Sequence, residues 1–431
     1  MGRSYWVETL GCPKNSVDSD KLVGTLLRDG LNPAATPGEA DLVVVNTCAF
    51  VEEARQESID TILALSGARK GGAELVVTGC LAERYGDELA EALPEVDAVT
   101  GFGVPVTLGR TSRAGRGTAT RERVALPAFD LLNLPRPASA VPWAYVKVAE
   151  GCDRACGFCA IPSFRGPQRS RSVASILEEV ESLQVQEVVL VAQDLAAFGR
   201  DLVRHGGADQ VGEGERSIVP LVDAVSARVP RVRLLYLYPS DLTDGLIDAV
   251  CRTGVAYFDL SLQHVSRPLL RRMRRWGDGA RFLARIEDIR EREPDAAFRS
   301  NFIVGYPGET EADHDALLAF VDAAQLDWCG FFSYSREDGT YAAGLDGEVP
   351  SSLVQERLGE LTERQDAITA ARRDDLLGRR VDVLVDGPGV GRTHREAPEI
   401  DGVVHVPASL VAGTFASLTV VGAAGPDLEA A

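Results

Sequence analysis

The chain has 431 residues, 45% of them hydrophobic, and a formal net charge of -19 at pH 7. This length predicts two or three domains. The acidic balance argues against a nucleic-acid-binding surface and suits a basic protein partner, although solubility alone explains it equally well. The first residues lack a signal-peptide pattern, and no apolar run approaches the roughly 18 residues of a membrane span, so we expect a cytoplasmic protein without a membrane segment.

Residues 1–103 predict an N-terminal domain built on an open parallel α/β sheet. The runs at 41–47 and 74–79 are nearly continuously apolar, as buried parallel strands are, and 5–11 alternates like a strand. Helical stripes at 16–30 and 54–67 lie between these strands. The alternation favours a parallel sheet with helices on both faces.

Three cysteines follow the three predicted strands of this domain. Cys12, Cys48 and Cys80 each lie just beyond the carboxyl end of a strand. Because those ends share one edge of a parallel sheet, where ligands of open α/β folds bind, we expect the thiols to converge. Three thiols are one ligand short of a closed cluster. The alternative is three buried and inert cysteines, since cysteine is a common core residue.

Residues 104–140 predict a linker. The segment is rich in Gly, Thr and Arg, lacks periodicity and ends in several prolines. A solvated linker is favoured over RNA contact for its basic patch, which consists of Arg110, Arg113, Arg116, Arg121 and Arg123.

A second cysteine triplet, Cys152, Cys156 and Cys159, follows a predicted strand with the spacing C-x3-C-x2-C. Structural zinc sites and cubane iron–sulfur clusters both usually take four protein ligands, so this loop predicts an open metal site. The alternatives are a zinc knuckle completed by a distant residue and reduced structural thiols. Cys251 and Cys329 fall outside both triplets, and we interpret them as structural.

Residues 141–370 predict a partial (β/α)6 barrel with a connecting helix. Six strand-like runs stand at 144–149, 187–193, 232–238, 257–262, 298–305 and 328–335. Active sites of parallel barrels lie at the carboxyl ends of the strands, where the second triplet, Gln193, Asp194, Gln263 and Gly305 belong. His264 is interpreted as structural, and the arginine-rich run 267–276 as a helix with a solvated face.

Residues 371–431 predict a small β-barrel, because short strands alternate with Gly and Pro turns. From residue 378 onward the region has four basic and seven acidic side chains, a net charge of -3. Such a module should bind nucleic acid poorly, so a protein surface is the favoured partner.

The motifs around both triplets resemble the methylthiotransferase family of radical S-adenosylmethionine (SAM) enzymes over nearly the full length. The matching stretches are TLGCPKNSVDSD, VNTCAF, VTGCLAERY and GCDRACGFCAIPSFRGPQRSR. The resemblance implies two [4Fe-4S] clusters, a SAM-binding one on the second triplet and an auxiliary one on the first. It places Phe158 beside the SAM adenine and identifies the C-terminal barrel as a TRAM domain. The other expected SAM contacts, taken from strand position, are Gln193, Asp194, Gln263, Arg299 and Gly305.

The resemblance also implies a reaction. SAM serves as radical source and as methyl donor, and a 5′-deoxyadenosyl radical removes hydrogen from the carbon that receives the methylthio group. The expected partners are an electron donor such as a flavodoxin or ferredoxin, and a sulfur donor.

Two branches of this family differ in substrate. One modifies an adenosine of transfer RNA, and the other modifies the β-carbon of an aspartate in a small-subunit ribosomal protein of the uS12 type. VAQDLAAFGRDL, SLQHVSRPLLRRMRR, FSYSREDGTYA and GRTHREAPEIDG resemble the second branch, and Ser261 departs from its pattern, in which proline is common. Glu337 and Asp338 stand where the transfer RNA branch has arginine and proline, and acidic residues there suit a basic protein target.

We therefore expect the ribosomal protein, or the assembled subunit, to bind the acidic surface and the TRAM domain. The alternatives are transfer RNA modification, a non-catalytic iron–sulfur carrier and a zinc-stabilised binding module.

Overall fold

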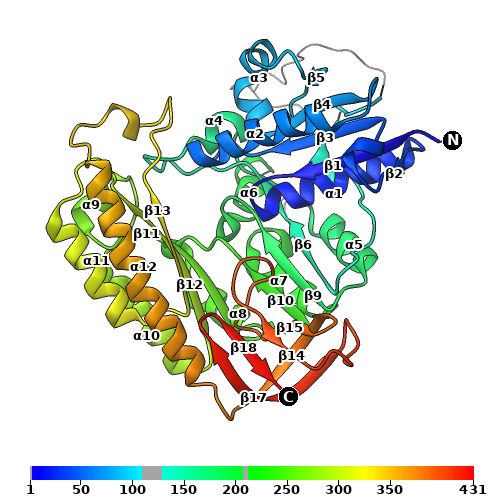
Figure 1. Cartoon of the computed structure of the whole chain (residues 1–431). Helices are drawn as coiled ribbons and strands as arrows, with labels where there is room; N and C mark the ends of the chain where they lie inside the picture. The colour runs from blue at the N-terminus through cyan, green and yellow to red at the C-terminus, as the bar shows by residue number, and fades with distance from the viewer. Residues whose placement is uncertain (1, 109–128, 207–211) are drawn as a thin grey trace.

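The computed structural model describes residues 2–108, 129–206 and 212–431 and arranges them in three parts (Figure 1). The N-terminal α/β part, in blue, packs on a central barrel in green and yellow, and a small β-barrel in red lies at the other end. This confirms the α/β multidomain fold predicted from the sequence. Residues 109–128 of the expected linker, with its basic patch, lie outside the described residues.

The N-terminal part is a parallel sheet with the strand order β2-β1-β3-β4-β5. Along β3, Val43 and Val45 pack into one core cluster while Leu42 and Val44 pack into another, so both faces of the sheet are covered. The strands are β1 (Ser4–Thr9), β2 (Asn32–Pro33), β3 (Leu42–Thr47), β4 (Glu74–Gly79) and β5 (Ala98–Val99). The helices are α1 (Pro13–Arg28), α2 (Glu52–Ala68) and α3 (Cys80–Ala92).

Six parallel strands form the partial barrel, and each overlaps the run predicted for it. They stand in the orders β6-β9-β10 and β11-β12-β13, and a parallel bridge between Leu237 and Leu260 connects the two groups. The strands are β6 (Trp143–Lys147), β9 (Glu187–Val191), β10 (Arg231–Leu234), β11 (Tyr257–Gln263), β12 (Ala297–Val304) and β13 (Trp328–Ser333). A short hairpin, β7 (Ala149–Glu150) with β8 (Arg169–Ser170), brackets the second triplet.

Helices follow these strands, and all but α4, which contacts α3 of the N-terminal part, belong to the central barrel. They are α4 (Ile161–Arg165), α5 (Val173–Leu183), α6 (Arg200–Gly206), α7 (Ile218–Ser226), α8 (Asp244–Cys251), α9 (Arg267–Arg272), α10 (Gly279–Arg292) and α11 (Glu311–Ala324). The helix predicted at 267–276 is shorter than expected, because α9 ends at Arg272 and Arg274 adopts a left-handed φ of 54°.

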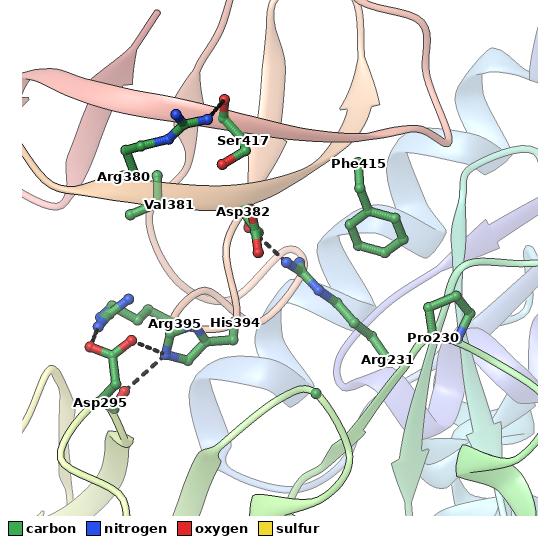
Figure 2. Close-up of a pocket in the computed structure, with 11 residues that line it drawn as sticks. Pro230, Arg231, Asp295, Arg380, Val381, Asp382, His394, Arg395, Phe415 and Ser417 are labelled. Carbon is green, nitrogen blue, oxygen red and sulfur yellow. Dashed lines mark hydrogen bonds and ion pairs between the residues drawn. The ribbon is translucent and has the colours of Figure 1, made fainter.

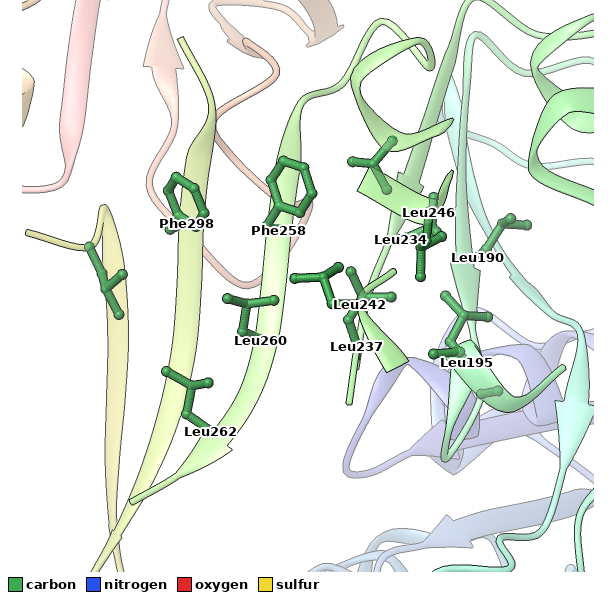
Figure 3. Packing of buried hydrophobic residues seen from close by; sticks show 14 of the residues in the cluster. Leu190, Leu195, Leu234, Leu237, Leu242, Leu246, Phe258, Leu260, Leu262 and Phe298 are labelled. Atoms are coloured by element: carbon green, nitrogen blue, oxygen red, sulfur yellow. The ribbon is translucent and has the colours of Figure 1, made fainter. Parts of the chain in front are cut away.

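Aliphatic and aromatic side chains fill the space between strands and helices (Figure 3). Leu190, Leu234 and Leu260 come from three successive strands, and none is more than 3% exposed. Full burial of one such leucine contributes about 1.5–3 kcal/mol. This packing fixes the strand ends that carry the candidate site.

The chain then runs through α12 (Ser351–Asp374) into a closed barrel with the strand order β14-β15-β16-β18-β17. Its strands are β14 (Arg380–Gly387), β15 (Val390–Arg392), β16 (Val404–His405), β17 (Phe415–Ala424) and β18 (Asp427–Ala430).

The loop between β15 and β16 leaves this small barrel and enters the central one. Ala397 of the loop is fully buried in the same hydrophobic cluster as Trp328 and Tyr145 of the central strands. The Trp328 indole donates to the Arg395 carbonyl (2.7 Å), and the Tyr145 hydroxyl donates to the Pro398 carbonyl (2.7 Å). The C-terminal loop is therefore part of the central core.

Candidate active site

The three N-terminal cysteines all follow strands at the carboxyl edge of the sheet. Cys12 is the N-cap residue of α1, Cys48 follows β3, and Cys80 is the first residue of α3. Gly11, with a φ of 92°, lets the first two approach, because a Cβ built on it would lie 2.9 Å from Sγ of Cys48. Among the influences on the pKa of Cys48 are the charges of both other thiols.

Asn15, which sequence reasoning missed, fastens these segments to one another. Its fully buried amide donates to the carbonyls of Leu10 (2.9 Å) and Thr47 (3.0 Å), in the turns that carry the first two cysteines. Its Oδ1 lies 3.7 Å from Sγ of Cys80. The available signal was an amide side chain in the first turn after Cys12, where it can reach neighbouring loops.

The three thiols differ in their electrostatic surroundings. Burial raises the pKa of Cys48 to about 12 and also raises that of Cys80. Burial acts in the same direction on Cys12, but the charges of Lys14 and Arg165, with backbone N–H hydrogen bonds, outweigh it and lower the pKa. Because the thiolate is the ligand form, Cys12 is the thiol best prepared for ligation.

The second triplet occupies the loop after β7, at the carboxyl end of β6. The backbone N–H of Cys152 donates to the carbonyl of Gly166 (3.0 Å), and that of Gly157 donates to the carbonyl of Met273 (2.8 Å). A Cβ on Gly157 would lie only 2.8 Å from the hydroxyl of Tyr306. The loop is thus held against the loops that follow β11 and β12.

N–H donors are aimed at the sulfurs of this triplet. The backbone nitrogen of Arg154 lies 3.4 Å from Sγ of Cys152, and Nη1 of Arg275 lies 3.4 Å from Sγ of Cys156. Burial raises the pKa of Cys152 to about 11 and that of Cys159 to about 12. Hydrogen bonds to ligating sulfurs are one of the ways proteins tune iron–sulfur clusters, so the donor set fits such a group.

The interpretation of 267–276 as a solvated face holds for the exposed Arg267, Arg271 and Arg274 but is wrong for Arg275. Arg275 is only 9% exposed, and its guanidinium lies 3.9 Å from the centre of the Tyr238 ring. It also donates to the Ser261 carbonyl. Because α9 ends at Arg272, the chain turns this arginine inward toward the second triplet.

Gln193 and Asp194 lie beside the second triplet. Nε2 of Gln193 donates to Glu150 (3.0 Å), and Asp194 is ion-paired with Arg154. Oε1 of Gln193 and Oδ1 of Asp194 are buried and have no hydrogen-bond partner among the described residues. Unpaired buried acceptors are costly, so both oxygens suit the donors of a bound cofactor.

Three further expected contacts come from the same end of the barrel. Phe158 packs against the barrel core, and Gln263 ends β11 with a left-handed φ of 71°. Gly305 opens the loop after β12 with a φ of 80°, and a Cβ there would lie 2.5 Å from Val354.

Arg299 is the expected cofactor residue that the structure does not bring to this group. It is the third residue of β12, and six strand positions at about 3.3 Å each place it about 20 Å before Gly305. Its Nη1 pairs with Asp401 of the C-terminal loop at 2.9 Å.

Arg165, also missed by sequence reasoning, reaches from the segment after the second triplet to a thiol of the first. It ends α4, directly after the second triplet, and its Nη2 lies 3.1 Å from Sγ of Cys80 and 2.8 Å from Oδ1 of Asn15. Its Nη1 lies 2.9 Å from both carboxylate oxygens of Glu150. The neighbouring Phe164 packs into the core of the N-terminal domain.

The interpretation of Glu337 as an acidic group offered to a basic target is wrong. Glu337 is 2% exposed, and one of its oxygens lies 2.5 Å from Arg55 and 2.5 Å from Arg84, both on helices of the N-terminal domain. Its charge is therefore neutralised within the molecule, whereas Asp338 is exposed.

A cavity of about 710 Å³ lies between the central and C-terminal barrels, away from these thiols (Figure 2). Arg231 begins β10 and Asp295 precedes β12, so the cavity is at the amino ends of the strands. Figure 2 shows Asp295 joined by dashed lines to His394 and Arg395, and Arg231 beside Phe415. The thiols, and not this cavity, locate the candidate chemistry.

Two features are absent from the residues that the structure describes. No three cysteine, histidine or carboxylate side chains within 2–108, 129–206 and 212–431 are grouped closely enough to ligate one metal ion. In the same ranges, no helix combines the length and apolar character needed to cross a membrane.

Family models match three segments of the chain. They are "Uncharacterized protein family UPF0004" over residues 4–101, the radical SAM superfamily over 146–321, and the TRAM domain over 377–431. The barrel and its three-cysteine loop thus define a radical SAM enzyme.

Curated relatives are similar over nearly the whole chain. Ribosomal protein uS12 methylthiotransferase RimO of Kineococcus radiotolerans is 41% identical, covering 99% of this chain and 97% of its own. The same-named proteins of Moorella thermoacetica and Cutibacterium acnes are 43% and 41% identical, covering 93% and 98% of this chain and 92% and 96% of theirs. The chain belongs to the ribosomal protein uS12 methylthiotransferase (RimO) family.

Solved structures of the radical SAM methyltransferase TsrM from Kitasatospora setae share the fold. One, with cobalamin and a [4Fe-4S] cluster bound, has a TM-score of 0.52 at 14% identity and covers 90% of this chain and 80% of its own. Another, with tryptophan and a SAM analogue, has a TM-score of 0.50 at 15% identity and covers 85% and 89%. At these identities the likeness concerns the fold alone.

Proposed function

We propose that this chain transfers a methylthio group to the β-carbon of an aspartate in ribosomal protein uS12. Curated relatives that match nearly its whole length carry the name of a uS12 methylthiotransferase. The observation that supports this activity best is the contact of Arg165, which follows the second triplet in the chain, with Cys80 of the first triplet, across the boundary between the N-terminal domain and the barrel.

In this proposal each triplet holds one [4Fe-4S] cluster: Cys152, Cys156 and Cys159 on the barrel side, and the first triplet as the auxiliary site. SAM bound at the barrel-side cluster supplies the radical chemistry that acid–base side chains cannot perform. The unpaired oxygens of Gln193 and Asp194 orient the cofactor.

The rest of the chain fixes the geometry between the two triplets. Phe164 anchors the segment after the second triplet in the N-terminal core, and Asn15 holds the turns of the first. Such fixed placement matters because a reacting carbon must be held within about 3–3.5 Å of its partner.

The target's charge suits this chain. The net charge of -19 favours association with a basic ribosomal protein, and the C-terminal barrel is itself acidic. In this proposal an electron donor such as a flavodoxin or ferredoxin, and a separate sulfur donor, act with the chain in the cytoplasm.

The substrate is tested by deleting the gene and measuring the masses of uS12 and of transfer RNA nucleosides by mass spectrometry. We expect uS12 from the deletion strain to lack the methylthio group on its aspartate and to regain it when the gene is restored. Transfer RNA adenosines should be unchanged. Loss of a methylthio group from transfer RNA, with uS12 unaffected, would contradict the proposed target.

The two clusters are tested with purified protein reconstituted anaerobically. We expect about eight irons per chain, and about four would contradict the auxiliary cluster. Cys156→Ala should abolish SAM cleavage, because its thiol belongs to the SAM-side triplet. Cys48→Ala should keep SAM cleavage and lose methylthio product, measured by chromatography of 5′-deoxyadenosine and mass spectrometry of uS12. Product formation by Cys48→Ala would contradict the role given to the first triplet.

A further inference from the structure

Arg165 belongs to the barrel but ends at a thiol of the N-terminal domain. Its side chain is only 2% exposed, and Nη2 lies 3.1 Å from Sγ of Cys80, which is hydrogen-bonding distance. The same nitrogen lies 2.8 Å from Oδ1 of Asn15, the residue that fastens the turns of the first triplet. The guanidinium therefore lines the first thiol site.

The orientation of this guanidinium is fixed from several sides. Glu150 accepts two hydrogen bonds from Nη1 at 2.9 Å, and an Asp18 oxygen lies 3.4 Å away. The Phe102 ring covers one face, 4.4 Å from the guanidinium carbon. Asp18 is itself paired with the buried Lys147, so the cluster of charges contains two cations and two carboxylates. Away from water, a charge at this position acts strongly on its neighbours.

We propose that Arg165 is a positioning residue of the auxiliary site: its N–H holds Cys80 in place, and its charge raises the reduction potential of the cluster bound there. This inference rests on the auxiliary cluster of the proposed function. A cluster gains one negative charge when it takes up an electron. A fixed cation and an N–H donor at a ligating sulfur stabilise that reduced form.

The same side chain is coupled to the second triplet. Glu150, its carboxylate partner, also accepts from Nε2 of Gln193 (3.0 Å) and from the backbone of Gly151 (3.0 Å), next to Cys152. Substitution of Arg165 in the intact chain therefore disturbs both sites. The test needs a protein in which the auxiliary cluster is the one cluster present.

The experiment uses the full-length chain with all three thiols of the second triplet changed to alanine. Arg165→Gln removes the charge and keeps an amide donor, whereas Arg165→Lys keeps the charge and loses the forked donor. Each protein is reconstituted anaerobically, its iron is measured, and its reduction by dithionite is followed by electron paramagnetic resonance. We expect the potential to fall in both variants, with the larger fall in Arg165→Gln.

Arg55→Gln is the matched control. It removes an arginine from the same boundary between domains, but there the partner is Glu337 and not a thiol. We expect its potential to remain close to that of the parent protein. An unchanged potential in an iron-loaded Arg165→Gln protein would overturn the inference alone. A parent triple-alanine protein that binds no iron would overturn the auxiliary cluster of the proposed function and this inference with it.

Discussion

His264 follows Gln263 at the end of β11 and is fully buried. Its Nδ1 accepts a hydrogen bond from the backbone N–H of Ser266 (3.1 Å), and its Nε2 has no partner among the described residues. Burial lowers the pKa of His264 to about 4, although Asp313 acts in the opposite direction. The neutral imidazole thus supports the turn after β11, in line with the structural role inferred from the sequence.

This buried histidine predicts a pH dependence of stability. The unfolded chain takes up a proton near the ordinary pKa of about 6.5, whereas the folded chain takes it up only near 4. The free energy of unfolding should therefore fall as the pH decreases from about 6.5 to about 4, by up to about 3 kcal/mol from this residue. His264→Asn should lack this component, measured by urea denaturation at a series of pH values. An identical pH dependence in wild-type and variant protein would rule the explanation out.

At the scale of single elements, the segment after β13 links the central barrel to the N-terminal domain. Glu337 pairs with Arg55 of α2 and Arg84 of α3, and Ser335 donates to its second oxygen (2.6 Å). Arg84 also donates to the carbonyl of Ala49, next to a cysteine of the first triplet (3.2 Å). One carboxylate thereby holds a barrel loop against the first thiol site.

Glu337→Gln should weaken this link between the barrel and the N-terminal domain. The substitution keeps the size of the side chain but leaves two arginines without a carboxylate, so we expect a loss of about 2 kcal/mol in the free energy of unfolding. Backbone amide exchange in the segment 335–341 should also become faster. Asp338→Asn removes an exposed charge from the next position and should stay within about 0.5 kcal/mol. Equal effects of the two variants would show that Glu337 is not a specific link.

The sequence predicted the strands more accurately than the side chains that individual charged residues bind. Strands such as β3 and β9 were found because a buried parallel strand is a local apolar run, and the positions of the cysteines after strands led to the grouping of Cys12 with its two partners. The roles of Glu337 and Arg165 could not be read in this way. Both bind side chains more than 80 positions away, and an isolated charged residue carries no periodic signal for its partner. The assignment of cofactor contacts to single residues stays a prediction.

At the scale of the whole molecule, the C-terminal barrel is tied into the central one. Asp401 of its loop accepts from Arg299 (2.9 Å), from the hydroxyl of Tyr257 (2.6 Å) and from the backbone of Ala397 (2.8 Å). At the same boundary, the fully buried Glu187 binds Arg233 and Arg392 of the two barrels. These contacts make the C-terminal module a structural part of the barrel, beyond any role in binding a partner.

Asp401→Ala should therefore destabilise more than its own loop. It leaves the Arg299 guanidinium, 15% exposed, without its closest carboxylate, and breaking such a pair costs about 3 kcal/mol. We expect the two barrels to unfold in separate thermal transitions, followed by differential scanning calorimetry. Asp382→Ala, at an exposed position of β14, should change stability by less than about 0.5 kcal/mol. A single transition at the wild-type temperature in Asp401→Ala would contradict this account.

The position of Arg165 in the chain has a consequence for synthesis. A nascent chain emerges from its N-terminus, and domains generally fold in that order. All three thiols of the first triplet emerge from the ribosome before Phe164 and Arg165. Phe164 packs into the N-terminal core, and Arg165 contacts Cys80. The thiols of the nascent N-terminal domain therefore stay accessible to oxidants and to other metal ions until at least 165 residues have left the ribosomal exit tunnel.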